Sequence, residues 1–135
     1  MANLQLSLKR NWFEMTKVGV KTEDYREITP YWAKRLLLYQ KRPLSESLSN
    51  FEIEDIFRDI NKCYDVEDLE YEIDNWYLTF KKIDANIMTL GYPKSTDTER
   101  ILKLEHKGIE IGYGKPEWGA EPNKLYFVIK HGAIL

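Results

Sequence analysis

The residues best suited to chemistry lie in one short charged stretch, residues 19–27. Five of these nine residues are Lys, Arg, Asp or Glu. Lys21 and Arg26 could hold a phosphate or a base edge, the arginine through two parallel hydrogen bonds. Glu23 and Asp24 could equally neutralise these cations in a structural ion-pair network. The residue types alone leave the binding site and the structural network both open.

The charged stretch is predicted to be a strand that follows a helix-ending glycine, Gly19. Side chains alternate between the two faces of a strand. The alternation assigns Lys21, Glu23 and Tyr25 to one face and Thr22, Asp24 and Arg26 to the other. Lys21 and Arg26 can then reach one pocket only if a bulge intervenes or if Arg26 acts from the rim. A solvated edge strand, whose charges deter aggregation, is the alternative.

A loop bounded by glycine and proline, residues 112–122, holds a second group of candidate residues. Tyr113 and Trp118 could stack on a base, a contact worth about 1–3 kcal/mol. Glu117 could act as a general acid or base. We expect the loop to bring Trp118 and Glu117 over the mouth of a cleft that Lys21 borders.

The surrounding chain is predicted to alternate between strands and helices, which indicates an α+β fold. Leucines at every second position predict a strand over residues 4–8. Asn11 is a typical cap for a helix over residues 12–18, and Thr29 for a second helix that reaches Tyr39. Further strands are predicted over residues 86–92 and 125–130, and two short strands are predicted over residues 101–113 with Gly108 in the middle. Short, mostly antiparallel strands with glycine corners favour a small β-barrel with flanking helices.

Residues 45–80 are predicted to be a helical insertion with an acidic outer face. Apolar residues at positions i, i+3, i+4 and i+7 predict an amphipathic helix from Ile53, Ile56, Phe57 and Ile60. Between Glu46 and Asp74 there are eleven acidic and two basic residues, a net charge of -9, so the rest of the chain carries +7. The acidic face can be a solvated surface, a screen beside a basic binding face, or a docking surface for a protein partner.

The composition indicates a folded single domain, residues 1–135, with 43% apolar residues and a net charge of -2. The N-terminus has no signal-peptide pattern, and no apolar run approaches the roughly 18 residues of a membrane span. Cys63 is the only cysteine, so no internal disulfide is expected. We therefore expect a cytoplasmic protein without a membrane partner. His106 and His131 have no companion ligands at metal spacing, so neither a metal site nor a cofactor is expected.

Several segments together resemble the ASCH domain family, whose fold is a PUA-like β-barrel. Gly19, Lys21 and Arg26 match the family's G-x-K-x-x-x-x-R pattern. Four further blocks are similar to an ASCH subgroup common in phages and bacterial mobile elements: residues 8–13, 27–32, 109–114 and 116–122. The resemblance covers residues 4–42 and about 84–135. It implies a small, mostly antiparallel ASCH barrel that carries residues 45–80 as a variable insertion.

The resemblance implies that RNA, a nucleotide or a modified nucleoside is bound in a cleft of the barrel. Added to the residue types, it favours five ligand-binding residues: Lys21, Tyr25, Arg26, Tyr113 and Trp118. The protein would then be a nucleic-acid or nucleotide-binding module. A different class of function is an alternative: the chain could be a protein-interaction module that docks a partner through the acidic insertion.

The family also implies an enzymatic alternative, a small hydrolase acting on an acylated nucleoside or on RNA. Its catalytic candidates here are Lys21, Glu23 and Glu117. One branch of the family uses a lysine, a threonine and a glutamate, and Lys21 matches the lysine. Asp24 stands at the position of the threonine, and a carboxylate cannot replace an alkoxide nucleophile without a change of mechanism. Whether the chain is an enzyme stays open.

Overall fold

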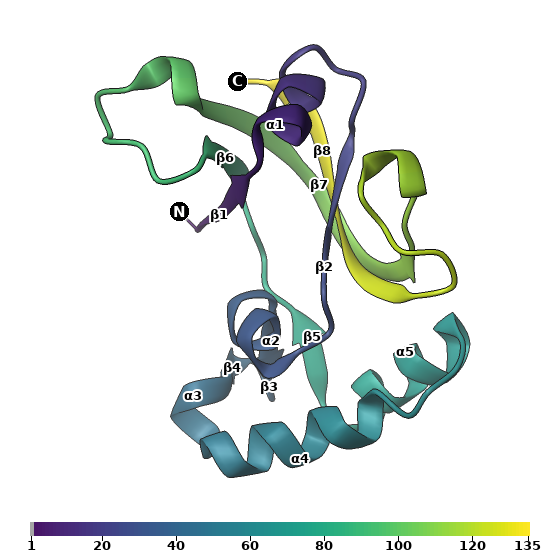
Figure 1. Cartoon of the computed structure of the whole chain (residues 1–135). Coiled ribbons are helices and arrows are strands. Elements are labelled where there is room, and N and C mark those ends of the chain that lie inside the picture. The colour runs from purple at the N-terminus through teal and green to yellow at the C-terminus, as the bar shows by residue number, and fades with distance from the viewer. Residues whose placement is uncertain (1) are drawn as a thin grey trace. The chain divides into compact units, whose positions relative to one another are not determined.

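The computed structural model of the chain describes residues 2–135 and is mixed α+β, as predicted (Figure 1). One sheet has five strands in the order β1-β6-β7-β8-β2, and a second has three strands in the order β4-β3-β5. The strands of the larger sheet are β1 (Asn3–Leu8), β2 (Glu23–Arg26), β6 (Ala85–Leu90), β7 (Ile101–Tyr113) and β8 (Leu125–Ile134). Those of the smaller sheet are β3 (Leu37–Tyr39), β4 (Arg42–Pro43) and β5 (Leu78–Phe80).

Helices connect these strands. The α-helices are α1 (Arg10–Lys17), α2 (Pro30–Leu36), α3 (Leu44–Ser47), α4 (Asn50–Ile60) and α5 (Val66–Asn75). Two short 3-10 helices are η1 (Thr98–Arg100) and η2 (Pro116–Trp118). Within residues 2–135, none of the helices combines the length and the apolar character that a membrane crossing requires.

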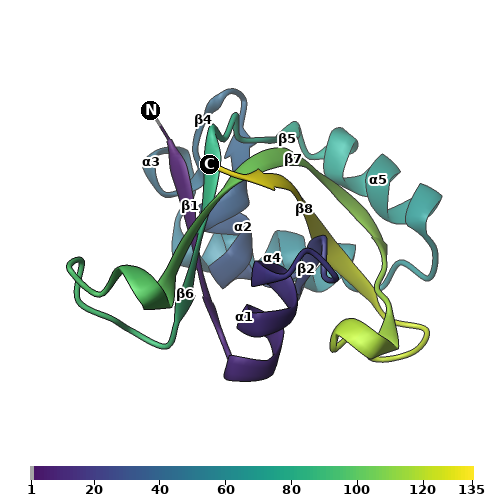
Figure 2. The same cartoon turned by 90° about the horizontal axis from the view of Figure 1, so that it is seen from above.

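The pairings described include both parallel and antiparallel neighbours. β1 runs parallel to β6, beside which it lies in Figure 2, whereas β6 and β7 are antiparallel. β3 is antiparallel to both of its neighbours, β4 and β5. The larger sheet ends at β1 and β2. These pairings are consistent with a small α+β barrel, and the PUA-like assignment stays a prediction.

The chain divides into two compact units. The first comprises residues 2–24, 82–109 and 129–135, and the second comprises residues 25–81 and 110–128. In the first unit the leucines of β1 are buried at every second position, as the alternation predicts. This unit contains ten basic and seven acidic residues, a net charge of +3. The second contains ten basic and fifteen acidic residues, a net charge of -5.

The predicted acidic segment, residues 45–80, lies in the second unit. The amphipathic helix predicted from Ile53, Ile56, Phe57 and Ile60 forms as α4, and its apolar stripe is buried. Ser49 and Glu52 make a reciprocal capping box at the start of α4, and Asp65 caps α5. The segment also supplies β5, which pairs with β3, so it contributes a strand to the smaller sheet as well as helices.

Three local predictions were wrong. The N-cap of α1 is Lys9, without a side-chain cap, and Asn11 lies inside the helix. α2 ends at Leu36, three residues before the predicted end, because Leu37–Tyr39 pairs with β5 as strand β3. Part of the predicted loop over residues 45–50 is the short helix α3. At the end of α2, a strand partner distant in sequence overrides the local helical signal.

The two phenylalanines of α4 offer a matched test of this packing. Phe57 is 1% exposed and Phe51 is 70% exposed. Phe57→Ala should lower the free energy of unfolding by about 3–5 kcal/mol, because it leaves a cavity in the buried face. Phe51→Ala should change it by no more than about 0.5 kcal/mol. Urea unfolding measures both, and equal effects would contradict this orientation of α4.

Candidate functional site

The candidate site begins where α1 ends. Gly19 adopts a φ of +82°, the left-handed conformation predicted for a helix-ending glycine. The backbone N–H groups of Val20 and Lys21 then both donate to the carbonyl oxygen of Met15, at 3.0 and 3.1 Å. This turn reverses the chain and brings the side chain of Lys21 into the interior, where it is 2% exposed.

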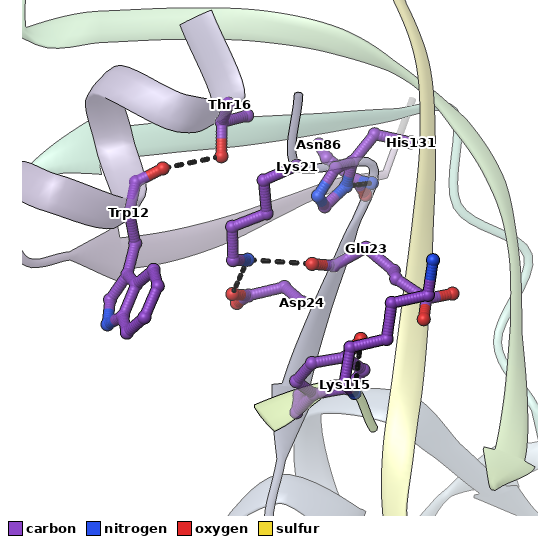
Figure 3. A network of polar contacts seen from close by, with 9 residues as sticks. Trp12, Thr16, Lys21, Glu23, Asp24, Asn86, Lys115 and His131 are labelled. Atoms are coloured by element: carbon purple, nitrogen blue, oxygen red, sulfur yellow. Dashed lines mark hydrogen bonds and ion pairs between the residues drawn. The ribbon is translucent and has the colours of Figure 1, made fainter. Parts of the chain in front are cut away.

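Lys21 forms a buried ion pair with Asp24 (Figure 3). Lys21 Nζ donates to Asp24 Oδ1 at 2.8 Å and to the backbone carbonyl oxygen of Glu23 at 2.6 Å. The predicted placement of Lys21 and Asp24 on opposite strand faces is therefore wrong. β2 begins only at Glu23, so strand alternation does not extend back to Lys21. The long lysine side chain folds over Glu23 and reaches Asp24.

A chain of three polar side chains lies in the same unit. His106 Nδ1 is 2.8 Å from Asn86 Oδ1, and Asn86 Nδ2 is 3.1 Å from His131 Nδ1. Asn86 Nδ2 also donates to the carbonyl oxygen of Lys130 at 3.3 Å. Asn86 and His131 are buried, and His106 is partly buried. The chain links β6, β7 and β8 by side-chain contacts in addition to their backbone pairing.

His131 is held in its neutral form. Burial lowers the pKa of His131 from its ordinary 6.5 to about 4. The positive charge of Lys21 and the neighbouring His106 act in the same direction, whereas Asp24 opposes the shift. Burial also lowers the pKa of His106. The buried part of the site therefore contains the ion pair of Lys21 with Asp24 beside a neutral histidine.

These residues border a cavity of about 400 Å³ in the first unit. Its buried floor is formed by Thr16, Lys21, Leu104 and His131. Exposed residues of the α1 end and the β8 end form the rim: Lys17, Val18, Gly19, Thr22, Ala133 and Ile134. Lysines 17 and 21 are the charged residues that line the cavity. The Thr16 hydroxyl donates a hydrogen bond to the carbonyl oxygen of Trp12, 2.7 Å away. Thr16 can therefore act only as a hydrogen-bond acceptor towards the cavity.

The floor of this cavity also contains an unsatisfied donor or acceptor. His131 Nε2 is buried and has no hydrogen-bond partner among the described residues. A buried polar atom without a partner costs about 1–3 kcal/mol, so such atoms point to a ligand or another functional role. This atom makes the cavity the strongest candidate site in the part of the chain that the structure describes.

The predicted site residues fall into different units. Lys21 and Glu23 belong to the first unit, and Lys21 lines the cavity. The other five belong to the second unit: Tyr25, Arg26, Tyr113, Glu117 and Trp118. Their assembly with Lys21 into one pocket stays a prediction.

Two of the five predicted site residues in the second unit, Tyr25 and Arg26, make contacts within that unit. The Tyr25 ring packs against Tyr126, and its hydroxyl oxygen accepts a hydrogen bond from the Lys115 N–H at 3.0 Å. The Arg26 guanidinium lies 4.8 Å from the centroid of the Trp32 ring, a cation–π contact. These two residues have structural roles that the sequence did not predict.

The loop residues of the second unit are more accessible. Tyr113 and Glu117 are exposed, and Trp118 is partly buried. Lys115 Nζ lies 4.3 Å from the centroid of the Trp118 ring. A side chain at Gly114 would meet Ala120 at 2.5 Å and the Tyr25 ring at 2.9 Å, so this glycine serves close backbone packing.

Sequence reasoning missed His131, Asn86 and Thr16. His131 was considered only as a metal ligand, and Asn86 only as part of a strand. No local pattern indicates that β6, β7 and β8 bring Asn86 between the two histidines. The only sequence signal is the rarity of a histidine and an asparagine within otherwise apolar strands.

No protein-family model, curated protein or solved structure matches the chain. Among the described residues, no group of three or more His, Cys, Asp or Glu side chains is arranged to hold a metal ion. The interpretation of the site therefore rests on its own geometry.

The Lys21–Asp24 pair should couple strongly in a double-mutant cycle. Asp24→Ala or Lys21→Met alone should each lower the free energy of unfolding by about 3–5 kcal/mol, because each leaves a buried charge without its partner. The double variant should cost clearly less than the sum of the two. Arg58 and Asp55, an exposed pair of α4 with the same i,i+3 spacing, provide the control, with an expected coupling of about 0.2–1 kcal/mol. Equal couplings measured by urea unfolding would contradict the assigned burial.

His131 should make stability depend on pH. Between about pH 6.5 and pH 4 the unfolded chain protonates His131 while the folded chain keeps it neutral, so stability falls as the pH is lowered through this window. From pH 6.5 to pH 4.5 the fall should reach about 2 kcal/mol, and it should be absent from His131→Gln once the contribution of the other groups is subtracted. Urea unfolding at pH 6.5 and 4.5 on both proteins measures the difference. Identical slopes would show that His131 is not held neutral.

Proposed function

We propose that this chain is a nucleic-acid or nucleotide-binding module and that RNA or a modified base enters the cavity lined by Lys21 and His131. The observation that carries the proposal is the buried His131 Nε2 without a partner at the floor of a cavity of about 400 Å³. Ligand sites are typically concavities of about 300–1,000 Å³ with apolar walls and a few placed polar groups.

The charges of the site favour a base over a phosphate at the floor. Asp24 balances Lys21 and His131 is neutral, so the floor is polar but carries no net charge. A phosphate there would compete with Asp24 for the lysine. The rim residue Lys17 and the net charge of +3 of this unit are better suited to attract the phosphate of a nucleotide.

The chemical character of the lining agrees with a base, which has apolar faces and polar edges. Val18, Leu104 and Ile134 offer apolar surface, while Thr16, Lys21 and His131 offer polar atoms. The resemblance to the ASCH family is part of this proposal, because Lys21 stands at the position of that family's site lysine. Arg26, Tyr113 and Trp118, which belong to the second unit, stay candidate RNA-binding residues.

A small hydrolase is the second candidate, favoured by the buried ion pair next to a neutral histidine. Strongly perturbed ionisable groups cluster at catalytic sites. Lys21 would hold the carbonyl oxygen of an acylated nucleoside, and Asp24 would accept a proton from water. Release of the free acid from an N-acylated nucleoside, lost in Lys21→Met, would identify the enzyme. Ligand binding without release of the acid would identify the binding module.

The rim of the cavity offers a test that leaves the buried floor intact. Val18 lines the cavity and is 71% exposed, whereas Val20 is 56% exposed and lies outside the lining. Nucleoside monophosphates and short RNAs should raise the melting temperature of the native protein, because a ligand stabilises the folded state that binds it. Val18→Trp should weaken binding at least about tenfold by filling the entrance, which corresponds to about 1.4 kcal/mol.

The matched variant Val20→Trp should keep the full response to ligand. If no nucleotide or RNA shifts the melting temperature of the native protein, the proposed function is wrong. If both tryptophan variants bind like the native protein, the ligand uses another surface.

A further inference from the structure

We propose that the cavity selects its ligand by a carbonyl-type acceptor, because the chain of His106, Asn86 and His131 presents a fixed N–H donor to it. The inference rests on the proposed function and names the chemical class of the ligand. The preferred bases carry an oxo group at the position that meets His131, and bases with an amino group there are rejected.

The orientation of the Asn86 amide follows from its contact with the backbone. One amide atom lies 3.3 Å from the carbonyl oxygen of Lys130. A carbonyl oxygen can only accept, so this atom must be the NH2 nitrogen, Nδ2. The opposite orientation would place two acceptors against each other. Asn86 Oδ1 is therefore the atom that faces His106.

The amide then determines the tautomers of both histidines. Asn86 Nδ2 uses one hydrogen for Lys130 and directs the other towards His131 Nδ1, 3.1 Å away. His131 Nδ1 must accept this hydrogen, so it carries no proton of its own. A neutral imidazole then carries its proton on Nε2. Asn86 Oδ1 requires a donor, so His106 carries a proton on Nδ1.

The resulting donor, Nε2–H, belongs to His131, whose side chain lines the cavity. His131 is 7% exposed and lines the cavity, and its Nε2 has no acceptor among the described residues. An oxo group of the ligand would satisfy this donor. An amino group would place a second donor against it and leave both unpaired in a buried site.

Pairs of nucleotides that differ in one group test this selection. Uridine and cytidine monophosphates differ by an oxo and an amino group, with the matching change at the adjacent ring nitrogen. Inosine and adenosine monophosphates differ in the same way. We expect the oxo member of at least one pair to bind about tenfold or more tightly by calorimetry, as expected for a site that rejects an unpaired donor.

His131→Leu should abolish this preference, whereas Val20→Trp, outside the lining, should retain it. Equal affinities within both pairs, a preference for the amino members, or a preference that survives His131→Leu would overturn the inference and leave the proposed function intact. Absence of binding by all four nucleotides and by short RNAs would instead overturn the proposed function, and the inference with it.

Nitrogen-15 NMR of the histidine rings provides a second measurement if His131→Leu does not fold. In the native protein near pH 7, His131 should be the Nε2–H tautomer and His106 the Nδ1–H tautomer. The Nε2 signal of His131 should move on addition of the preferred nucleotide. A proton on His131 Nδ1, or an Nε2 signal that the bound nucleotide does not change, would overturn the inference.

Discussion

The buried ion pair between Lys21 and Asp24 is the contact on which the candidate site depends. An ammonium group inside a protein is tolerated only with a partner and further hydrogen bonds, and here Asp24 and the Glu23 carbonyl supply them. The pair ties the turn after α1 to the start of β2. The N–H of His131 donates to the carbonyl oxygen of Thr22 in the same turn, so the end of β8 is held there as well. The cavity lies between these tied segments.

The floor of the cavity is polar without a net charge, and this balance distinguishes it from a phosphate site. Asp24 balances Lys21, and burial keeps His131 neutral in spite of the nearby carboxylate. The floor can therefore recognise a ligand by the arrangement of the ligand's hydrogen-bond donors and acceptors. In a low-dielectric surrounding, a fully satisfied polar network also rigidifies the core, and each unsatisfied member is costly. Within the chain from His106 to His131, His131 Nε2 is a buried atom without a partner among the described residues.

The differences between prediction and structure have specific causes. Helical spacing alone predicts that α2 reaches Tyr39, but the pairing of β3 with β5 gives residues 37–39 partners some 40 residues away in sequence. Strand alternation separates Lys21 from Asp24, but a helix-ending turn extends to Thr22 and the strand begins later. The resemblance to a known family selected Lys21 without indicating what Lys21 contacts. Local patterns do not contain contacts between distant segments.

The sequence by itself determined the α+β class, the amphipathic helix α4, the cap at Thr29 and the left-handed Gly19. These features depend on periodicity, on backbone conformation or on residue type, which act over a few residues. Only the tertiary structure decided that Asp24 is the partner of Lys21. It also decided that Asn86 lies between two histidines, His106 of β7 and His131 of β8. The reason is physical: the protonation of a buried side chain is set by the groups packed around it, and strand pairing brings those groups from 20 and 45 residues away.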